Sequence, residues 1–137
     1  MILVDTSVII DFLKDKQNAK VELFADILER KYPWGINEFI FQEVLQGARD
    51  EIEWNQLKDY LESVPFYFLR YGHVSFERTA RINFNCRRLG VTVRSSIDLL
   101  IVETALENDI ALLHNDGDFT NIQKVVQDLR VYDRKLS

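Results

Sequence analysis

The first seven residues constrain the fold more than any other stretch of the chain. Three apolar residues, 2–4, are followed at once by Asp5 and two hydroxyl side chains, and a second apolar run occupies residues 8–13. This pattern predicts a short buried strand, a tight turn and a helix, which places Asp5 at the carboxyl end of a central strand in a parallel sheet. In open α/β sheets, chemistry collects outside that end of the strands, so we expect other carboxylates to gather at Asp5.

Apolar runs alternate with helical patterns along the rest of the chain, which predicts an α/β fold with a mostly parallel sheet. Further strands are expected at residues 32–36, 66–69, 110–113 and, at an edge, 129–132. Further helices are expected at residues 21–28, 38–49 with Asn37 as cap, 51–64, 75–89 with Ser75 as cap, 95–106 and 122–126. With 137 residues, few Gly and Pro, and no linker or repeat, residues 1–137 are expected to form one domain.

The net charge of −5 excludes a chain that is basic overall, as a nucleic-acid-binding domain often is, but does not say how the acids are arranged. They either form an ordinary solubilising surface or concentrate in one site that a metal cation neutralises. The single cysteine, Cys86, rules out an intramolecular disulfide framework and fits a reducing compartment. No apolar run approaches a membrane span of roughly 20 residues, and no basic region precedes the first apolar residues, so we expect a cytoplasmic protein without membrane association.

Two candidate carboxylates lie where a helix begins. Asp5 follows the first strand, where Asp is a preferred cap, although Thr6 and Ser7 cap equally well and would leave Asp5 free. Asp98 ends a Ser-x-x-Asp sequence that begins at Ser95 and resembles a capping box, and the helix dipole favours a carboxylate in the first turn. Capping does not explain the setting of Asp98, because the following helix is almost wholly apolar and must be buried. A charge there needs a partner, or its pKa rises.

The other candidates are Glu43, within an apolar helix face, and the pair Asp116 and Asp118 after a buried strand. An exposed helical Glu is common, and Asp is an ordinary turn residue, so each has a purely structural alternative. The acidic turn nevertheless follows a second buried parallel strand, which puts it at the same sheet edge as Asp5. Considered together, these carboxylates predict one acidic site.

Carboxylates that converge without a cation repel one another strongly at short range, so such a site indicates a divalent metal. Mg²⁺ takes few carboxylates and keeps waters, which leaves positions for phosphate oxygens. Because no matching set of His or Cys accompanies the acids, Mg²⁺ or Mn²⁺ is favoured over Zn²⁺. Sites of this kind cut phosphodiesters, since the metal lowers the pKa of a bound water and steadies the leaving oxygen.

Four stretches, taken in order, resemble the PIN-domain ribonucleases and, most closely, the VapC toxins of toxin–antitoxin pairs. These stretches are residues 1–11 (MILVDTSVIID), 42–47 (QEVLQG), 97–107 (IDLLIVETALE) and 113–119 (LHNDGDF). The resemblance implies a Rossmann-like sheet with helices on both faces. It also implies Mg²⁺- or Mn²⁺-dependent endonucleolytic cleavage of RNA that leaves a 5′-phosphate and a 3′-hydroxyl, a homodimer, and a small cognate antitoxin that occupies the groove.

The resemblance further implies a role for each matching residue. The catalytic acids of the family match Asp5, Glu43, Asp98 and Asp116. Of these, Asp5, Asp98 and Asp116 would hold the metal, with Asp118 as a supporting acid. Thr6 or Ser7 would orient Asp5 or a bound water.

Residues outside these motifs leave several alternatives open. Arg87, Arg88 and Arg94 are expected either to contact RNA phosphates or to form a solvated basic face. His114 is interpreted as a packing or turn residue. Residues 51–76 match no family motif and are expected to tune substrate choice or dimer contacts.

Three other functions compete with RNA cleavage. A non-catalytic PIN-like module would bind RNA or a protein, and a missing acid would favour it, but none is missing. A DNA nuclease of the same fold would often carry more acids and a basic clamp. A phosphoacceptor receiver domain needs adjacent acids after the first strand and a late strand-end Lys, which Asp5-Thr6 and His114-Asn115 do not supply.

Overall fold

A parallel three-stranded sheet lies at the centre of the computed structural model, which describes residues 1–134; the last three positions of the domain predicted over 1–137 lie outside the described residues. The strands are β1 (Ile2–Val4), β2 (Trp34–Gly35) and β3 (Ala111–Leu113), in the order β2-β1-β3. The central strand β1 pairs in parallel with both neighbours and is buried throughout. These observations confirm the predicted α/β fold and its parallel sheet.

Two further segments extend the sheet, each by a single parallel bridge. The bridges join Ile36 to Phe66 and Leu112 to Val131. The predicted strands at 66–69 and 129–132 are therefore wrong in extent, because each contributes one bridged residue.

At the first of these edges, Gly35 allows the neighbouring segment to approach closely. A Cβ at position 35 would collide with the carbonyl oxygen of Pro65 and lie 2.7 Å from the Tyr67 ring. Pro65 has no N–H, so it pairs only through its carbonyl, which accepts from the Ile36 N–H at 3.0 Å. The Tyr67 N–H donates to the Ile36 carbonyl at 2.8 Å, and these two hydrogen bonds form the single bridge between the segments.

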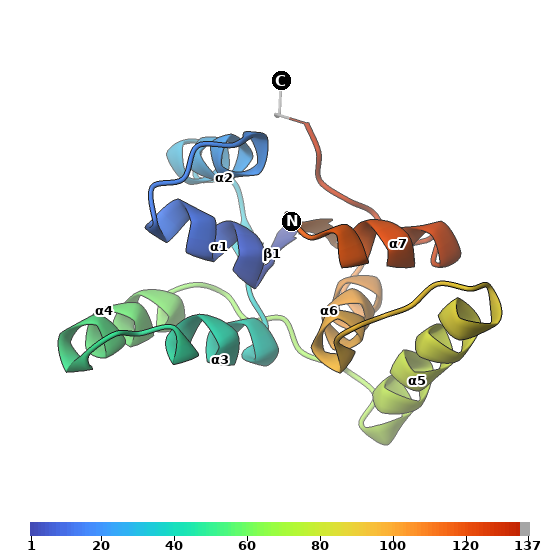
Figure 1. Cartoon of the computed structure of the whole chain (residues 1–137). Coiled ribbons are helices and arrows are strands. Elements are labelled where there is room, and N and C mark those ends of the chain that lie inside the picture. Colours follow the sequence, from blue (N-terminus) through green and yellow to red (C-terminus); the bar gives the residue numbers. More distant parts are fainter. Residues whose placement is uncertain (135–137) are drawn as a thin grey trace.

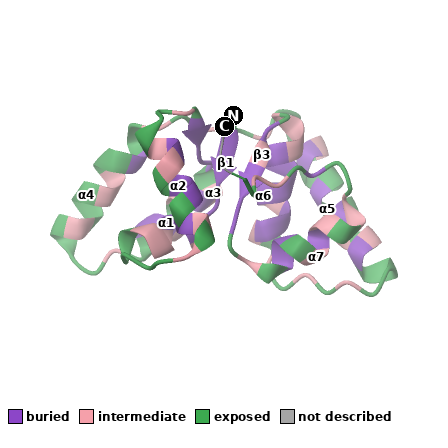
Figure 2. Cartoon of the chain, turned by 90° about the horizontal axis from the view of Figure 1, so that it is seen from above, coloured by how far each residue is buried: buried purple, intermediate pink, exposed green. Residues whose placement is uncertain are grey.

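Seven helices in the described part of the chain surround the sheet. They are α1 (Thr6–Leu13), α2 (Ala19–Glu29), α3 (Glu38–Gln46), α4 (Glu51–Glu62), α5 (His73–Arg88), α6 (Ser96–Glu107) and α7 (Gly117–Val125). They lie on both sides of the strands, and α5 packs beside α6 (Figure 1). Figure 2 shows the buried strands at the centre, while α4 and the outer side of α5 are exposed. No helix within residues 1–134 is long and apolar enough to cross a membrane.

Several helix boundaries differ from the predictions, including three at α3, α5 and α7. Helix α3 ends at Gln46 rather than at residue 49, and α7 begins at Gly117 rather than near residue 122. Helix α5 begins at His73, after Gly72 in a left-handed conformation with φ of 56°.

The predicted cap of α5, Ser75, is wrong for a reason that lies outside its own helix. Ser75 is buried in the first turn, and its hydroxyl donates to Glu107 Oε1 on α6 at 3.0 Å. Its Oγ also accepts from the Tyr71 N–H, before the helix, at 3.0 Å. Because the acceptor Glu107 is far away in the sequence, local spacing suggested a cap where the fold uses a contact between helices.

Asn37 joins α3 to α6. Its Oδ1 accepts from the Ile40 N–H at 2.8 Å, which confirms the predicted cap of α3. Its Nδ2 donates to Thr104 Oγ1 on α6 at 3.1 Å, and both side chains are buried. Because buried polar groups need hydrogen-bond partners, this contact holds together the two helices that carry Glu43 and Asp98.

We expect Asn37→Ala to lower the free energy of unfolding by about 2–3 kcal/mol, because a helix cap is lost and a buried Thr104 oxygen loses its donor. Asn18→Ala is the matched control, since the partly exposed Asn18 caps α2 at the Val21 N–H (2.9 Å) and should cost only about 1 kcal/mol. Urea unfolding measures both losses. Equal losses for the two variants would show that the contact with Thr104 adds no stability.

Candidate metal and active site

The pairing of β1 with β3 brings two acidic segments to one edge of the sheet. Val4 lies opposite Leu113, and the Asp5 N–H continues the ladder by donating to the Leu113 carbonyl at 2.9 Å. The chain therefore leaves both strands side by side at their carboxyl ends, as predicted, with Asp5 on one and the turn before α7 on the other.

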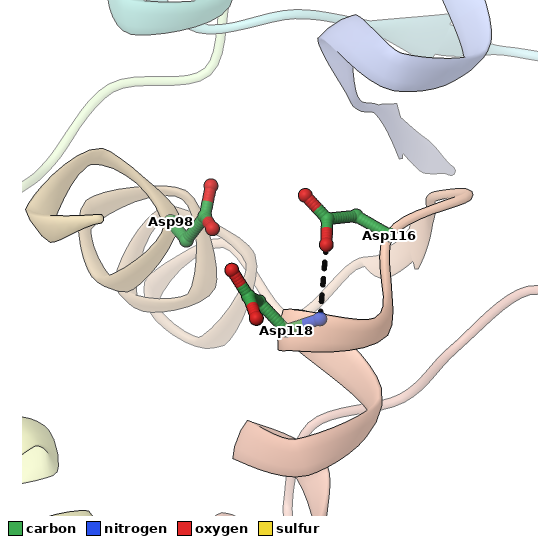
Figure 3. Close-up of side chains that lie close together, drawn as sticks. All are labelled: Asp98, Asp116 and Asp118. Carbon is green, nitrogen blue, oxygen red and sulfur yellow. Dashed lines mark hydrogen bonds between the residues drawn. The ribbon is translucent and has the colours of Figure 1, made fainter. Parts of the chain in front are cut away.

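Three carboxylates form a close group, which we call the acidic triad: Asp98, Asp116 and Asp118. One oxygen from each lies within 4.8 Å of the others. Figure 3 shows them converging from the first turn of α6, from the turn before α7 and from the start of α7. Asp118, expected as a supporting acid, thus lies among the closest carboxylates, whereas Asp5, expected as a metal ligand, lies beside the triad.

Asp98 carries the most unfavourable charge of the triad. It is buried, and no residue within 1–134 donates a hydrogen bond to its carboxylate. Burial, followed by the negative charges of Asp5 and Asp116, raises the pKa of Asp98 to about 7. A carboxylate in such a setting favours either a proton or a cation.

The capping box suggested for α6 is only half present. Ser95 caps the helix, because its Oγ accepts from the Ile97 N–H at 3.2 Å. Asp98 makes no return bond to the backbone of Ser95. Its carboxylate is therefore available to a ligand.

Asp5 is itself the cap of α1, so the prediction that Thr6 or Ser7 caps the helix and leaves Asp5 free is wrong. Asp5 Oδ2 accepts from the Ser7 N–H at 3.0 Å and from the Ser7 hydroxyl at 2.6 Å. Both of these bonds use Oδ2, and the Thr6 N–H also interacts with the carboxylate. Burial raises the pKa of Asp5 to about 6, against the opposing effect of the Ser7 hydrogen bonds.

Thr6 and Ser7 orient two different acids. The Thr6 hydroxyl donates to Glu43 Oε1 at 2.9 Å, which ties α3 to the first turn of α1. The Ser7 hydroxyl donates to Asp5 and accepts from the Asn115 N–H at 3.0 Å. The negative charge of Glu43 acts on both Asp5 and Asp98, so Glu43 belongs to the same electrostatic site as the two aspartates.

Three residues that the sequence did not mark as part of the site hold the turn before α7, namely Asp11, Asn18 and Asn115. Asn115 Nδ2 donates to Asp11 Oδ2 at 3.3 Å, and Asn18 Nδ2 donates to the same oxygen. Asp11 therefore connects the turn to α1 and α2. Local sequence carries no signal for this contact, because Asp11 and Asn115 are far apart in the chain.

His114 has the packing and turn role predicted for it. Its Nδ1 accepts from the Asp116 N–H at 3.2 Å, and its ring lies 4.9 Å from that of Phe119. Burial, together with the charge of Lys20, lowers the pKa of His114 to about 4. The ring is neutral at physiological pH and positions Asp116.

Arg94 pairs with the acidic triad. Its Nη2 and Nε both donate to Asp118 Oδ1, at 2.9 and 3.2 Å. The side chain is 76% exposed, while that of Asp118 is only 9% exposed. The guanidinium therefore partly offsets the charge of the triad, a role that sequence reasoning missed because Arg94 was considered only as an RNA contact or a solvated charge.

The donors of the triad suit a hard divalent cation. All three are carboxylates, Asp98 has no competing hydrogen bond, and Asp116 and Asp118 each use only Oδ1 in contacts with the protein. Oxygen donors without His or Cys are typical of Mg²⁺ and Mn²⁺ sites. The residues present thus fit such an ion.

Comparison with known proteins matches the chain to one family by its sequence. The model of the PIN domain family matches residues 2–125. Ribonuclease VapC11 of Mycobacterium tuberculosis is 30% identical over 126 residues, which is 91% of this chain and 93% of that protein.

Solved structures share the fold at lower identity. VapBC-1 from nontypeable Haemophilus influenzae superposes with a TM-score of 0.72 at 21% identity, covering 97% of this chain and 98% of that chain. FitAcB from Neisseria gonorrhoeae superposes with a TM-score of 0.68 at 21% identity, covering 96% of both chains. At these identities the match shows the fold alone.

We expect Asp98→Asn to stabilise the metal-free protein at high pH. The folded protein holds the Asp98 proton with a pKa of about 7, against 3.8 for a free side chain, so folding stability falls as pH rises between these values. At about pH 8 the free energy of unfolding of the variant should exceed that of the parent by about 1–2 kcal/mol, which is less than the full pKa difference implies because solvent screens the charge. At about pH 4 this difference should vanish. Thermal melting of the variant and the parent in EDTA, between about pH 4 and pH 8, measures this difference.

The exposed α4 variant Asp59→Asn is the matched control and should show no such pH-dependent gain. A loss of stability for Asp98→Asn at every pH would instead assign Asp98 to the helix dipole of α6.

Arg94→Gln is expected to bind Mn²⁺ a few-fold more tightly than the parent protein. The guanidinium competes for Asp118 and repels a cation, so both consequences of its removal act in the same direction. Isothermal titration measures the affinity, with Arg88→Gln as a control for the loss of one positive charge. Weaker binding by Arg94→Gln would mean that Arg94 orders Asp118 for the ion.

Proposed function

This chain belongs to the PIN domain family and to its VapC branch, and from that membership we propose that it is a Mg²⁺-dependent endoribonuclease acting as the toxin of a type II toxin–antitoxin pair. The observation that carries the proposal is the acidic triad of Asp98, Asp116 and Asp118 at the carboxyl edge of the sheet, with Asp5 and Glu43 beside it. The relative from Mycobacterium tuberculosis that is 30% identical to this chain, Ribonuclease VapC11, is a ribonuclease by name, which supports the proposal.

The proposed metal residues are Asp98, Asp116 and Asp118; Asp5, which the family resemblance implied as a ligand, is proposed to act on water through its Oδ1. When bound, Mg²⁺ or Mn²⁺ supplies Lewis acidity toward a phosphate and a water. Asp98 favours this role because its raised pKa reflects a charge that no protein donor stabilises.

Asp5 and Glu43 are the proposed groups that orient water and hold its proton. Ser7 fixes Asp5 through Oδ2, and Thr6 fixes Glu43 through Oε1, so each acid presents its other oxygen in a set direction. A carboxylate with a pKa of about 6 is largely ionised at neutral pH yet more basic than a free Asp, which suits a general base.

The proposed reaction is hydrolysis of an RNA phosphodiester. The water oxygen bonds to phosphorus, the bond from phosphorus to the 3′ oxygen breaks, and that oxygen takes a proton. The products are a 5′-phosphate and a 3′-hydroxyl, and the reaction requires no oxidant or second substrate.

The proposed partners are RNA, a small antitoxin and a second copy of the chain. The solved structures with the same fold include VapBC complexes, which supports an antitoxin. Residues 51–76 expose several large apolar side chains, which supports protein contacts through this region. These side chains are Ile52, Trp54, Tyr60, Phe68 and Tyr71. Because the proposed substrate is RNA, we propose that the protein acts in the cytoplasm.

Asp5→Asn is expected to reduce Mg²⁺-dependent cleavage of single-stranded RNA by at least about 100-fold, because the oriented acid beside the triad is lost. Its melting temperature should not fall, since Asn also caps helices and the substitution removes a buried charge. Gel analysis of labelled RNA, in EDTA and after adding Mg²⁺, measures the activity. Undiminished cleavage by the variant would remove Asp5 from the mechanism.

Asp15→Asn provides the control, because Asp15 is exposed beyond the end of α1 and should leave cleavage unchanged. A DNA strand of the same sequence separates the two nuclease alternatives: preferential cutting of DNA would contradict the ribonuclease assignment. Binding of RNA without cleavage by the parent protein would favour the non-catalytic module.

A further inference from the structure

A groove of about 680 Å³ lies between α5, the connector 90–94 and the start of α6. We call it the α5–α6 groove. Its volume falls within the about 300–1,000 Å³ typical of ligand clefts. None of the residues that line it is acidic, although the chain has 22 acids, and it contains the guanidinium groups of Arg87 and Arg94. The lining of the groove therefore carries no acid and two arginines, of which Arg94 bonds Asp118 and Arg87 has no ion pair with a described residue.

One side of α5 forms the wall of this groove. Phe76, Ala80, Asn83 and Arg87 recur at intervals of three or four residues, so they share one helical face, and all line the groove. Arg88 belongs to a different face, where its guanidinium lies 5.7 Å from the centre of the Phe84 ring. The structure thus separates Arg87 from Arg88, which the sequence could not distinguish.

The groove adjoins the acidic triad through Arg94, which lines the groove and bonds Asp118. Ser96 and Leu99, which also line it, lie beside Asp98 in the sequence of α6. A chain lying in the groove would therefore pass beside the triad.

From this continuity we propose that the α5–α6 groove binds the single-stranded RNA next to the scissile phosphate, with Arg87 contacting a phosphate and Phe76 stacking on a base. This inference rests on the proposed function and names its substrate class.

Charge and shape both favour a single strand. Phosphates complement the guanidinium groups, while the half-buried apolar side chains of Val93 and Leu100 suit a base rather than water. The Phe76 ring is 52% exposed, so a face or edge is open to contact. A base can stack on an aromatic side chain only when it has left its own helical stack, which a duplex resists.

The test is binding of a short fluorescein-labelled single-stranded RNA, measured by anisotropy across a salt series with fixed Mg²⁺. All proteins carry Asp5→Asn to suppress cleavage, and a gel confirms that the RNA stays intact. Arg87→Gln should weaken binding several-fold and reduce the slope of log affinity against log salt by up to about 0.7, the value for one phosphate contact on a single strand. Arg88→Gln, the adjacent arginine, should leave both quantities near those of the parent.

Phe76 is tested by two substitutions that keep its bulk. Phe76→Leu should lower affinity for the single strand by about tenfold, and Phe76→Tyr, which retains the ring, should preserve it. A matched RNA duplex should bind all three proteins with similar affinity. Unchanged melting temperatures show that the variants remain folded.

Two results would overturn the inference: no measurable binding of single-stranded RNA by the parent, or equal behaviour of Arg87→Gln and Arg88→Gln together with full affinity in Phe76→Leu. The groove would then be left to a protein partner. RNA binding that depends on Arg87 and Phe76, in a protein that never cleaves RNA when Asp5 is intact, would instead sustain the groove and refute the proposed nuclease.

Discussion

Parallel pairing of β1 with β3 is the constraint on which the site depends. It places Asp5 and the turn before α7 at the same carboxyl edge, where α6 adds Asp98 from its first turn. Asp5, Asp98 and Asp118 are buried at this edge, and Asp116 is half-buried. Burial is the largest cause of the raised pKa values of Asp5, about 6, and Asp98, about 7. A fold that gathers acids in this way favours a cation at their centre.

The acids tolerate one another because most of them have separate polar partners. Ser7 bonds Asp5, Thr6 bonds Glu43, and Arg94 bonds Asp118. Asp98 is the exception, since no described residue donates a hydrogen bond to its carboxylate. In the metal-free protein, the charges of the neighbouring acids therefore destabilise ionised Asp98 most. The buried contact of Asn37 with Thr104 keeps α3 and α6 together against that repulsion.

Acidic and basic side chains gather in separate, neighbouring regions of the protein. The net charge of −5 therefore says little about function. The acids converge at the sheet edge, whereas the adjoining α5–α6 groove has Arg87 and Arg94 and no acid among its lining residues. A polyanion can therefore approach a protein that is acidic overall. Arg94 stands between the two regions, since it lines the groove and bonds Asp118. For the proposed ribonuclease, this arrangement would deliver the substrate beside the cation site.

Local sequence determined the central strands, most of the helices and the identity of the acids, because apolar periodicity and the position of an acid after a strand are properties of neighbouring residues. The order of motifs along the chain also sufficed to indicate the family. Tertiary structure alone decided which acids converge most closely, because Asp118 joins the triad and Asp5 lies beside it only once α6 and α7 are packed. It also decided that Ser75 bonds Glu107 and that Arg87 and Arg88 face different ways, since the first contact spans two helices and the second depends on what packs beside α5.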